Sequence, residues 1–146
     1  MKGADSHKPV ALLQTEFNES HGAFSPDGQY VAYTSDESGR SEIYVQTFPD
    51  PTRRWQVSTE GGSWPRWRRD GNELFFLALD TAVMVASVSL PRGVFGVPQS
   101  ACGGCRAAPT FGRPYDAVAD GRRVLVLSSL RNPGDEALTV ILDWSR

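Results

Sequence analysis

The sequence predicts an all-β protein made of repeated antiparallel units, and three observations support this prediction. The 146 residues include 14 glycines and 10 prolines, a share typical of a chain with many tight turns. No segment repeats apolar residues at a sustained 3.6-residue period, so we expect little helix. An Asp-Gly pair lies between apolar runs at residues 27–28, 70–71 and 120–121. Each pair has the form of a hairpin turn, in which glycine supplies the positive φ.

The three units share one order of strands, in which an innermost strand precedes the Asp-Gly turn and further strands follow it. The strands after the turn are predicted at 30–34, 41–48 and 53–58 in the first unit, at 73–78, 83–88 and near 95–100 in the second, and at 124–129 and 137–144 in the third. The Asp-Gly pairs are 43 and 50 positions apart. Four antiparallel strands in each repeat of about 40–50 residues are typical of a β-propeller blade.

The propeller interpretation divides the chain into a flexible tail at 1–8 and a half-propeller at 9–146. Its blades are predicted at about 20–58, 63–100 and 114–144. An ordinary β-sandwich, in which Asp-Gly hairpins recur by chance, is the alternative.

Three blades do not close a ring, which typically needs about 4–8. The segment 10–15 precedes the first unit without belonging to it, and Thr15 lies 12 positions before Asp27, as Ser58 does before Asp70. Segment 10–15 therefore aligns with the outer fourth strand of a preceding blade. We expect a symmetric homodimer that forms a six-bladed ring, in which segment 10–15 of each chain completes the third blade of its partner. The rival is a truncated piece of a longer propeller, without independent function.

The composition excludes several classes of protein. Hydrophobic residues make up 40% and charged residues 22%, which fits a folded chain rather than a disordered one. A net charge of −2 argues against nucleic acid or an anionic membrane as the main partner. The most apolar stretch, residues 82–90, is far shorter than the about 20 residues of a membrane helix.

Catalytic motifs, metal ligands and cofactor-binding motifs are not recognised, so the candidate site comes from aligning the innermost strands around a central funnel. Ala23, Arg66 and Asp116 share one position, and His21, Trp64 and Pro114 share another, two residues earlier. The predicted ligand-binding residues of the funnel are His21, Trp64, Arg66, Tyr115 and Asp116. Arg66 and Asp116 either pair with each other or face a ligand. The alternative is structural, with Trp64 packed between blades and Arg66 in an ion pair.

The two cysteines, Cys102 and Cys105, form a Cys-x-x-Cys pair that fits a redox dithiol, half of a zinc site or two thiols in a loop. A zinc site would need two more ligands, and the only histidines, His7 and His21, are too far from the pair in sequence to supply them at zinc-site spacing. The flanking residues indicate a loop rather than the start of a helix. We therefore expect a loop whose thiols are able to form a disulfide.

The repeat motifs resemble a known family. The run FSPDGQYVAY at 24–33, followed by EIYV at 42–45, is similar to the TolB-type propeller repeat. The run GGSWPRWRRDG at 61–71 and the ending LTVILDW at 138–144 resemble the C-terminal portion of bacterial serine/threonine kinase-like receptors that carry such propellers. The resemblance covers residues 9–146, but the third unit has VADG at 118–121 where the family usually has Ser-Pro-Asp-Gly. A kinase segment is not recognised, so the resemblance assigns no kinase residues to this sequence.

This resemblance implies a fold rather than a function, because propellers host binding and catalysis alike. The leading hypothesis is a non-catalytic module that binds a small molecule or protein at the funnel. The alternative from another class is a metal-dependent hydrolase or lactonase, for which His21 and Asp116 are the available ligands. The first residues contain no apolar signal-peptide core, so localisation is left open. The resemblance implies a bacterial protein, extracytoplasmic in a parent protein.

Overall fold

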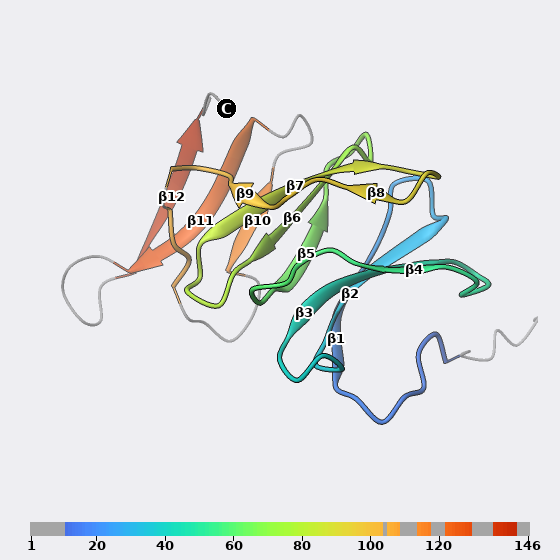
Figure 1. The fold of residues 1–146 in the computed structure, drawn as a ribbon. Helices are drawn as coiled ribbons and strands as arrows, with labels where there is room; N and C mark the ends of the chain where they lie inside the picture. Colours follow the sequence, from blue (N-terminus) through green and yellow to red (C-terminus); the bar gives the residue numbers. More distant parts are fainter. Residues whose placement is uncertain (1–10, 104, 109–113, 118–121, 130–135, 143–146) are drawn as a thin grey trace, which may run out of the picture.

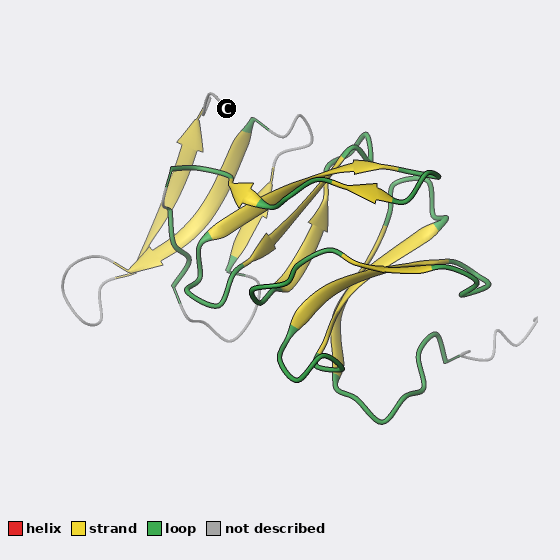
Figure 2. Ribbon diagram, in the orientation of Figure 1, coloured by secondary structure: helices red, strands yellow, loops and turns green. Residues whose placement is uncertain are grey.

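Residues 11–103, 105–108, 114–117, 122–129 and 136–142 are described by a computed structural model of the chain. They form three antiparallel sheets, which lie side by side in chain order (Figure 1). The strands, shown in yellow in Figure 2, are accompanied by no helix in these ranges. The prediction of an all-β protein is confirmed.

The strands of each sheet follow one another along the chain, and each pairs with the next, except that β9 pairs with β7 instead of β8. The first sheet contains β1 (Glu19–Phe24), β2 (Tyr30–Ser35), β3 (Glu42–Thr47) and β4 (Arg54–Gln56). The second contains β5 (Ser63–Trp67), β6 (Glu73–Leu77), β7 (Val83–Ser89), β8 (Val94–Phe95) and β9 (Gln99–Ser100). The third contains β10 (Tyr115–Ala117), β11 (Arg123–Ser129) and β12 (Glu136–Leu142).

Two of the predicted Asp-Gly turns have the same hydrogen bonds. Asp27 and Asp70 each accept the backbone N–H of the residue two positions on, at 3.0 Å. Gly28 and Gly71 have φ values of 70° and 75°, and each donates its N–H to the carbonyl three positions before, at 2.9 Å. The positive φ explains why glycine occupies both turns. The third pair, at 120–121, lies outside the described residues.

The predicted fourth strand of the second unit, near 95–100, is replaced by two short strands. Both β8 and β9 pair with the same edge of β7, at its two ends, in registers that differ by one residue. Between them Gly96 donates its N–H to the carbonyl of Ser87 at 2.9 Å, and Pro98 has no N–H to donate. A continuous ladder is therefore interrupted at Pro98.

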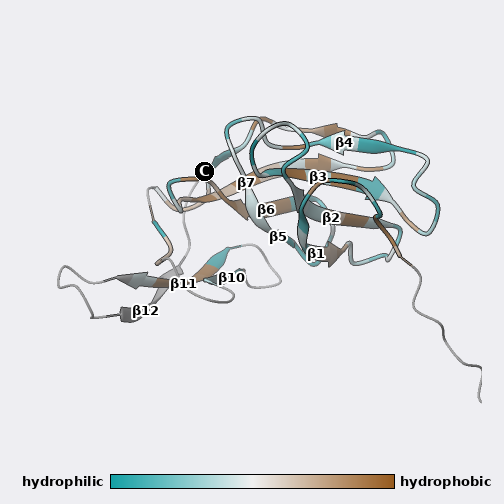
Figure 3. Ribbon diagram, turned by 90° about the horizontal axis from the view of Figure 1, so that it is seen from below, coloured by the Kyte–Doolittle hydropathy of each residue, from teal (hydrophilic) through white to brown (hydrophobic). Residues whose placement is uncertain are grey.

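The core consists of two apolar layers, one on each side of the second sheet. Strand β6 is buried along its whole length because alternate residues point to opposite sides. Leu74 and Phe76 pack against the first sheet, whereas Phe75 and Leu77 pack against the third. Figure 3 shows apolar residues on β2, β3 and β6, whereas the outer strand β4 is mostly hydrophilic.

The two outer faces of the three sheets expose apolar residues whose repeat equivalents are buried inside. Leu125, five positions after its Asp-Gly aspartate, is 37% exposed, whereas the equivalent Ala32 and Phe75 are both 0% exposed. Phe24 is 58% exposed on the first sheet, whereas its equivalent Trp67 packs between the first two sheets. The outer faces therefore carry apolar residues at positions that are buried between sheets in the other repeats.

The N-terminal segment covers part of the first sheet's outer face. Leu12 and Leu13 pack against the buried residues Val31, Tyr33 and Tyr44. Residues 11–15, the described part of the predicted strand 10–15, form no strand within a single chain. The predicted tail at 1–8 lies outside the described residues. Within the described ranges, no helix is long and apolar enough to cross a membrane.

Candidate functional site

A bulge recurs in the innermost strands of the first two sheets. The register shifts between Ser20 and Ala23 in β1 and between Ser63 and Arg66 in β5. The residue inside each bulge, His21 or Trp64, has a left-handed backbone, with φ of 54° and 56°. Such a conformation costs an L residue about 1–3 kcal/mol and is often found at functional sites.

The two bulges bring the predicted residues His21 and Trp64 into contact. Their ring centroids are 3.8 Å apart, and the ring planes are inclined by 30°. Tyr115 of β10 donates its hydroxyl hydrogen to the carbonyl of Trp64 at 2.6 Å, and its own ring is buried between the second and third sheets. The three inner strands are thus tied together through Trp64.

The electrostatic environment of His21 is set by burial and by Arg66. Partial burial, and then the positive charge of Arg66, lower the pKa of His21 from its ordinary value of 6.5. The Nδ1 atom lies 3.0 Å from the hydroxyl of Ser20. The imidazole is therefore neutral near pH 7, a form that hydrogen-bonds without adding charge.

Arg66 and Asp116 do not face each other. Arg66 lies opposite Phe75 in the β5–β6 pair and so points toward the third sheet. Asp116 is exposed and lies opposite Leu125, on the outer face of the third sheet. The structure therefore brings His21, Trp64, Arg66 and Tyr115 to one rim and leaves Asp116 on the other side of its strand.

A hollow of about 250 Å³ lies beside Trp64, next to the start of β5 and the end of β6. The exposed side chain of Leu79 separates it from a larger hollow of about 470 Å³ toward the outer strands. The smaller hollow is lined by strand residues of the second sheet and by residues of the neighbouring connections: Ser41, Gly62, Ser63, Trp64, Leu77, Ala78, Leu79, Thr81, Ala108 and Pro114.

Two interactions near this site were not predicted from the sequence. Trp67 of β5 donates its Nε1–H to the carbonyl of Ala23 in β1 at 3.0 Å, a hydrogen bond between the second and first sheets. Glu42 at the start of β3 is only 1% exposed, although it carries a carboxyl group.

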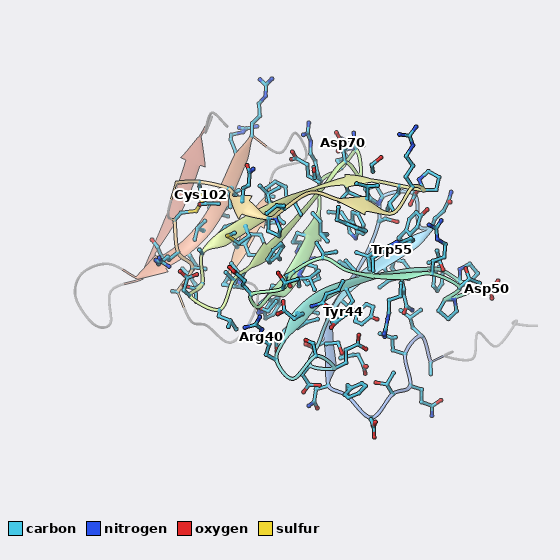
Figure 4. All side chains as sticks on the ribbon, viewed as in Figure 1. Arg40, Tyr44, Asp50, Trp55, Asp70 and Cys102 are labelled. Atoms are coloured by element: carbon cyan, nitrogen blue, oxygen red, sulfur yellow. A yellow bond between two sulfur atoms is a disulfide. The ribbon has the colours of Figure 1, made fainter. Side chains whose placement is uncertain are left out.

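The Glu42 carboxylate holds the connection between the first two sheets. It accepts the backbone N–H of Gly61 at 2.9 and 3.0 Å to its two oxygens, and it accepts the hydroxyl of Ser58. Arg40, labelled in Figure 4, donates from Nε at 2.7 Å. These donors satisfy the buried charge and fix the chain where it enters β5.

Cys102 and Cys105 are joined by a disulfide at the outer edge of the second sheet, near β9 in Figure 4. Before the loop, Ala101 donates its N–H to the carbonyl of Val83 at 2.8 Å. After it, Val83 donates its N–H to the carbonyl of Cys105 at 3.3 Å. The disulfide therefore closes a loop that bulges out of an extended segment along β7. The described residues contain no group of three His, Cys, Asp or Glu side chains placed to hold a metal ion.

No family model matches this chain. The Tol-Pal system protein TolB of Pseudomonas aeruginosa is 40% identical over 58 residues, which are 40% of this chain and 13% of that protein. TolB from Acinetobacter baumannii superposes with a TM-score of 0.51 and 18% identity, over 95% of this chain and 44% of that chain. An oligogalacturonate lyase from Vibrio parahaemolyticus gives a TM-score of 0.63 and 14% identity, over 82% and 32%.

These similarities relate the chain to TolB-type β-propellers and show the fold alone. The chain spans less than half the length of each of these relatives.

Proposed function

We propose that the three sheets are blades, and that two copies of this chain close a six-bladed propeller that binds a ligand or protein at its inner rim without catalysing a reaction. The observation that carries the ring is the exposure of Leu125, whose equivalents Ala32 and Phe75 are fully buried between sheets. Phe24 adds a second exposed position on the opposite outer face. Positions that are buried between sheets in one repeat and exposed in another support the interpretation that a further blade covers these faces.

The N-terminal segment supports the same arrangement. Leu12 lies 43 positions before Trp55, the spacing of the first two Asp-Gly pairs. Leu12 packs against the outer face of the first sheet. Trp55, from the outer strand β4 of the first sheet, packs against the second sheet in the same way. Segment 11–15 thus lies where the outer strand of a preceding blade would be. In the described residues β12 pairs only with β11, so the third blade of a second copy has an edge for that strand.

Sedimentation of two matched variants tests the ring. Leu125→Asp places a charge in the proposed interface, so we expect it to shift the assembly to single chains. Leu79→Asp changes a leucine that is 64% exposed beside the hollows and away from the outer faces, so it should assemble like the wild type. Equal assembly of both variants would contradict the proposed interface.

The binding role rests on the rim formed by His21, Trp64, Arg66 and Tyr115, where ring stacking and a hydrogen bond order residues from three strands. Asp116 is also one of the proposed ligand-binding residues, although it lies on the opposite face of β10 from Tyr115. The resemblance to kinase-like receptors suggests a sensory or scaffolding setting for this rim.

We place the protein outside the bacterial cytoplasm, because disulfides persist in oxidising compartments and Cys102 and Cys105 are joined. Thiol alkylation of protein collected directly from cells tests this placement. Protection of both cysteines is expected, and complete alkylation without prior reduction would contradict it.

A further inference from the structure

We propose that Arg66, His21 and Trp64 form a binding site for a small molecule that carries a carboxylate, an inference that rests on the proposed function in assigning the inner rim to binding.

The guanidinium of Arg66 supplies the selectivity. Arg66 is only partly exposed, and within the described residues it has no ion pair or hydrogen bond with an acid or a carbonyl. It is the only charged residue of β5, and β2 has none. Glu19, the only charged residue of β1, accepts a hydrogen bond from Thr15. In the part of the chain that the structure describes, the Arg66 guanidinium therefore has no ion-pair partner, and a guanidinium binds a carboxylate through two parallel hydrogen bonds.

The stacked rings of Trp64 and His21 supply a rigid wall next to this charge. Both residues have left-handed backbones, and the hydroxyl of Tyr115 fixes the carbonyl of Trp64. A site whose side chains are already ordered loses less entropy when a ligand binds.

His21 reports on the charge at this site. Burial and Arg66 lower its pKa, and the charged side chains of its own strand and its neighbours β2 and β5 are Glu19 and Arg66. A carboxylate bound to Arg66 offsets the positive charge and raises the pKa of His21 toward 6.5. By linkage, the protonated protein then binds the carboxylate more tightly than the neutral protein.

The test follows His21 by proton NMR with benzoate as the probe. The chain has two histidines, so His7→Ala leaves His21 as the only imidazole signal. Saturating benzoate is expected to raise its pKa by about 0.5, equivalent to about threefold tighter binding to the protonated form. In the double variant with Arg66→Gln, the benzoate effect should be lost. The matched control Arg69→Gln changes an exposed arginine in the next turn and should keep the effect.

Three outcomes would overturn the site: no benzoate-dependent change in His21, the same change with Arg66→Gln, or its loss with Arg69→Gln. The carboxylate could also come from Asp116 of a second copy. If Asp116→Asn lowers the pKa of His21 without benzoate, the protein supplies the anion and the free-ligand proposal fails.

Sedimentation of the same samples separates this inference from the ring. Dimers in which benzoate leaves His21 unchanged would refute the site and retain the ring. Single chains in which benzoate raises the pKa of His21 would retain the site and refute the ring.

Discussion

Replacing Glu42 with alanine is expected to lower the free energy of unfolding by about 3–5 kcal/mol, because its buried carboxylate accepts two hydrogen bonds whose donors would lose their partner. The carboxylate is 1% exposed and accepts hydrogen bonds from two buried groups, the N–H of Gly61 and the hydroxyl of Ser58. Each hydrogen bond to a charged group contributes about 1.5–3 kcal/mol. Arg40 is half exposed, so its pair adds at most about 1 kcal/mol.

Urea denaturation followed by tryptophan fluorescence measures this loss. Glu37→Ala is the matched control, because Glu37 also forms a 2.7 Å ion pair, with Arg54, but in a partly exposed setting. Its expected cost is below about 1 kcal/mol. Glu42→Gln retains an acceptor oxygen and should lie between the two, which keeps the test informative if Glu42→Ala does not fold. A cost for Glu42→Ala equal to that of the control would refute the role assigned to Glu42.

Three further predictions concern the same sheets. Cys105→Ser opens the loop to Cys102 and should cost about 2 kcal/mol in urea denaturation, from the entropy of a four-residue loop; reduction of the wild type should match it, and no loss in either would contradict the prediction. Trp67→Phe removes the hydrogen bond to Ala23 and should cost about 0.5–1.5 kcal/mol; an unchanged thermal midpoint would contradict it. The pKa of His21 is lower in the folded chain, so the unfolded state binds the proton more readily and the free energy of unfolding falls as pH drops through about 6.5. His21→Gln should weaken this pH dependence between about pH 7.5 and 5.5. The same pH dependence in the variant and the wild type would contradict the prediction.

The parts of the fold that could be predicted are those that depend on neighbouring residues. The Asp27 and Asp70 turns follow from the aspartate side chain and the following glycine, and alternating apolar residues indicate the strands beside them. The interruption near Pro98 could have been expected from its missing N–H. Repeat spacing aligned segment 10–15 with an outer strand, but the packing of Leu12 and Leu13 on the first sheet depends on residues of β2 and β3 that are distant in sequence.

Repeat alignment predicted which residues of the innermost strands are equivalent, but it did not predict their geometry. Repeat alignment placed His21 and Trp64 as equivalents, yet their stacking depends on a left-handed backbone that neither residue type signals. Arg66 and Asp116 were considered as a pair, but equivalent positions in successive sheets point the same way, so the two cannot face each other. Glu42 was missed because a charged residue at the start of a strand is usually solvated, and the donors that bury it come from a distant connection.

The solution mass of the wild-type chain, measured by native mass spectrometry and light scattering, distinguishes the closed ring of two chains from a single chain. A chain has a mass of 16.0 kDa, and the proposed closed ring predicts a species of twice that mass that persists on dilution. A compact species of a single chain, with Leu125 and Phe24 open to solvent, would contradict the ring.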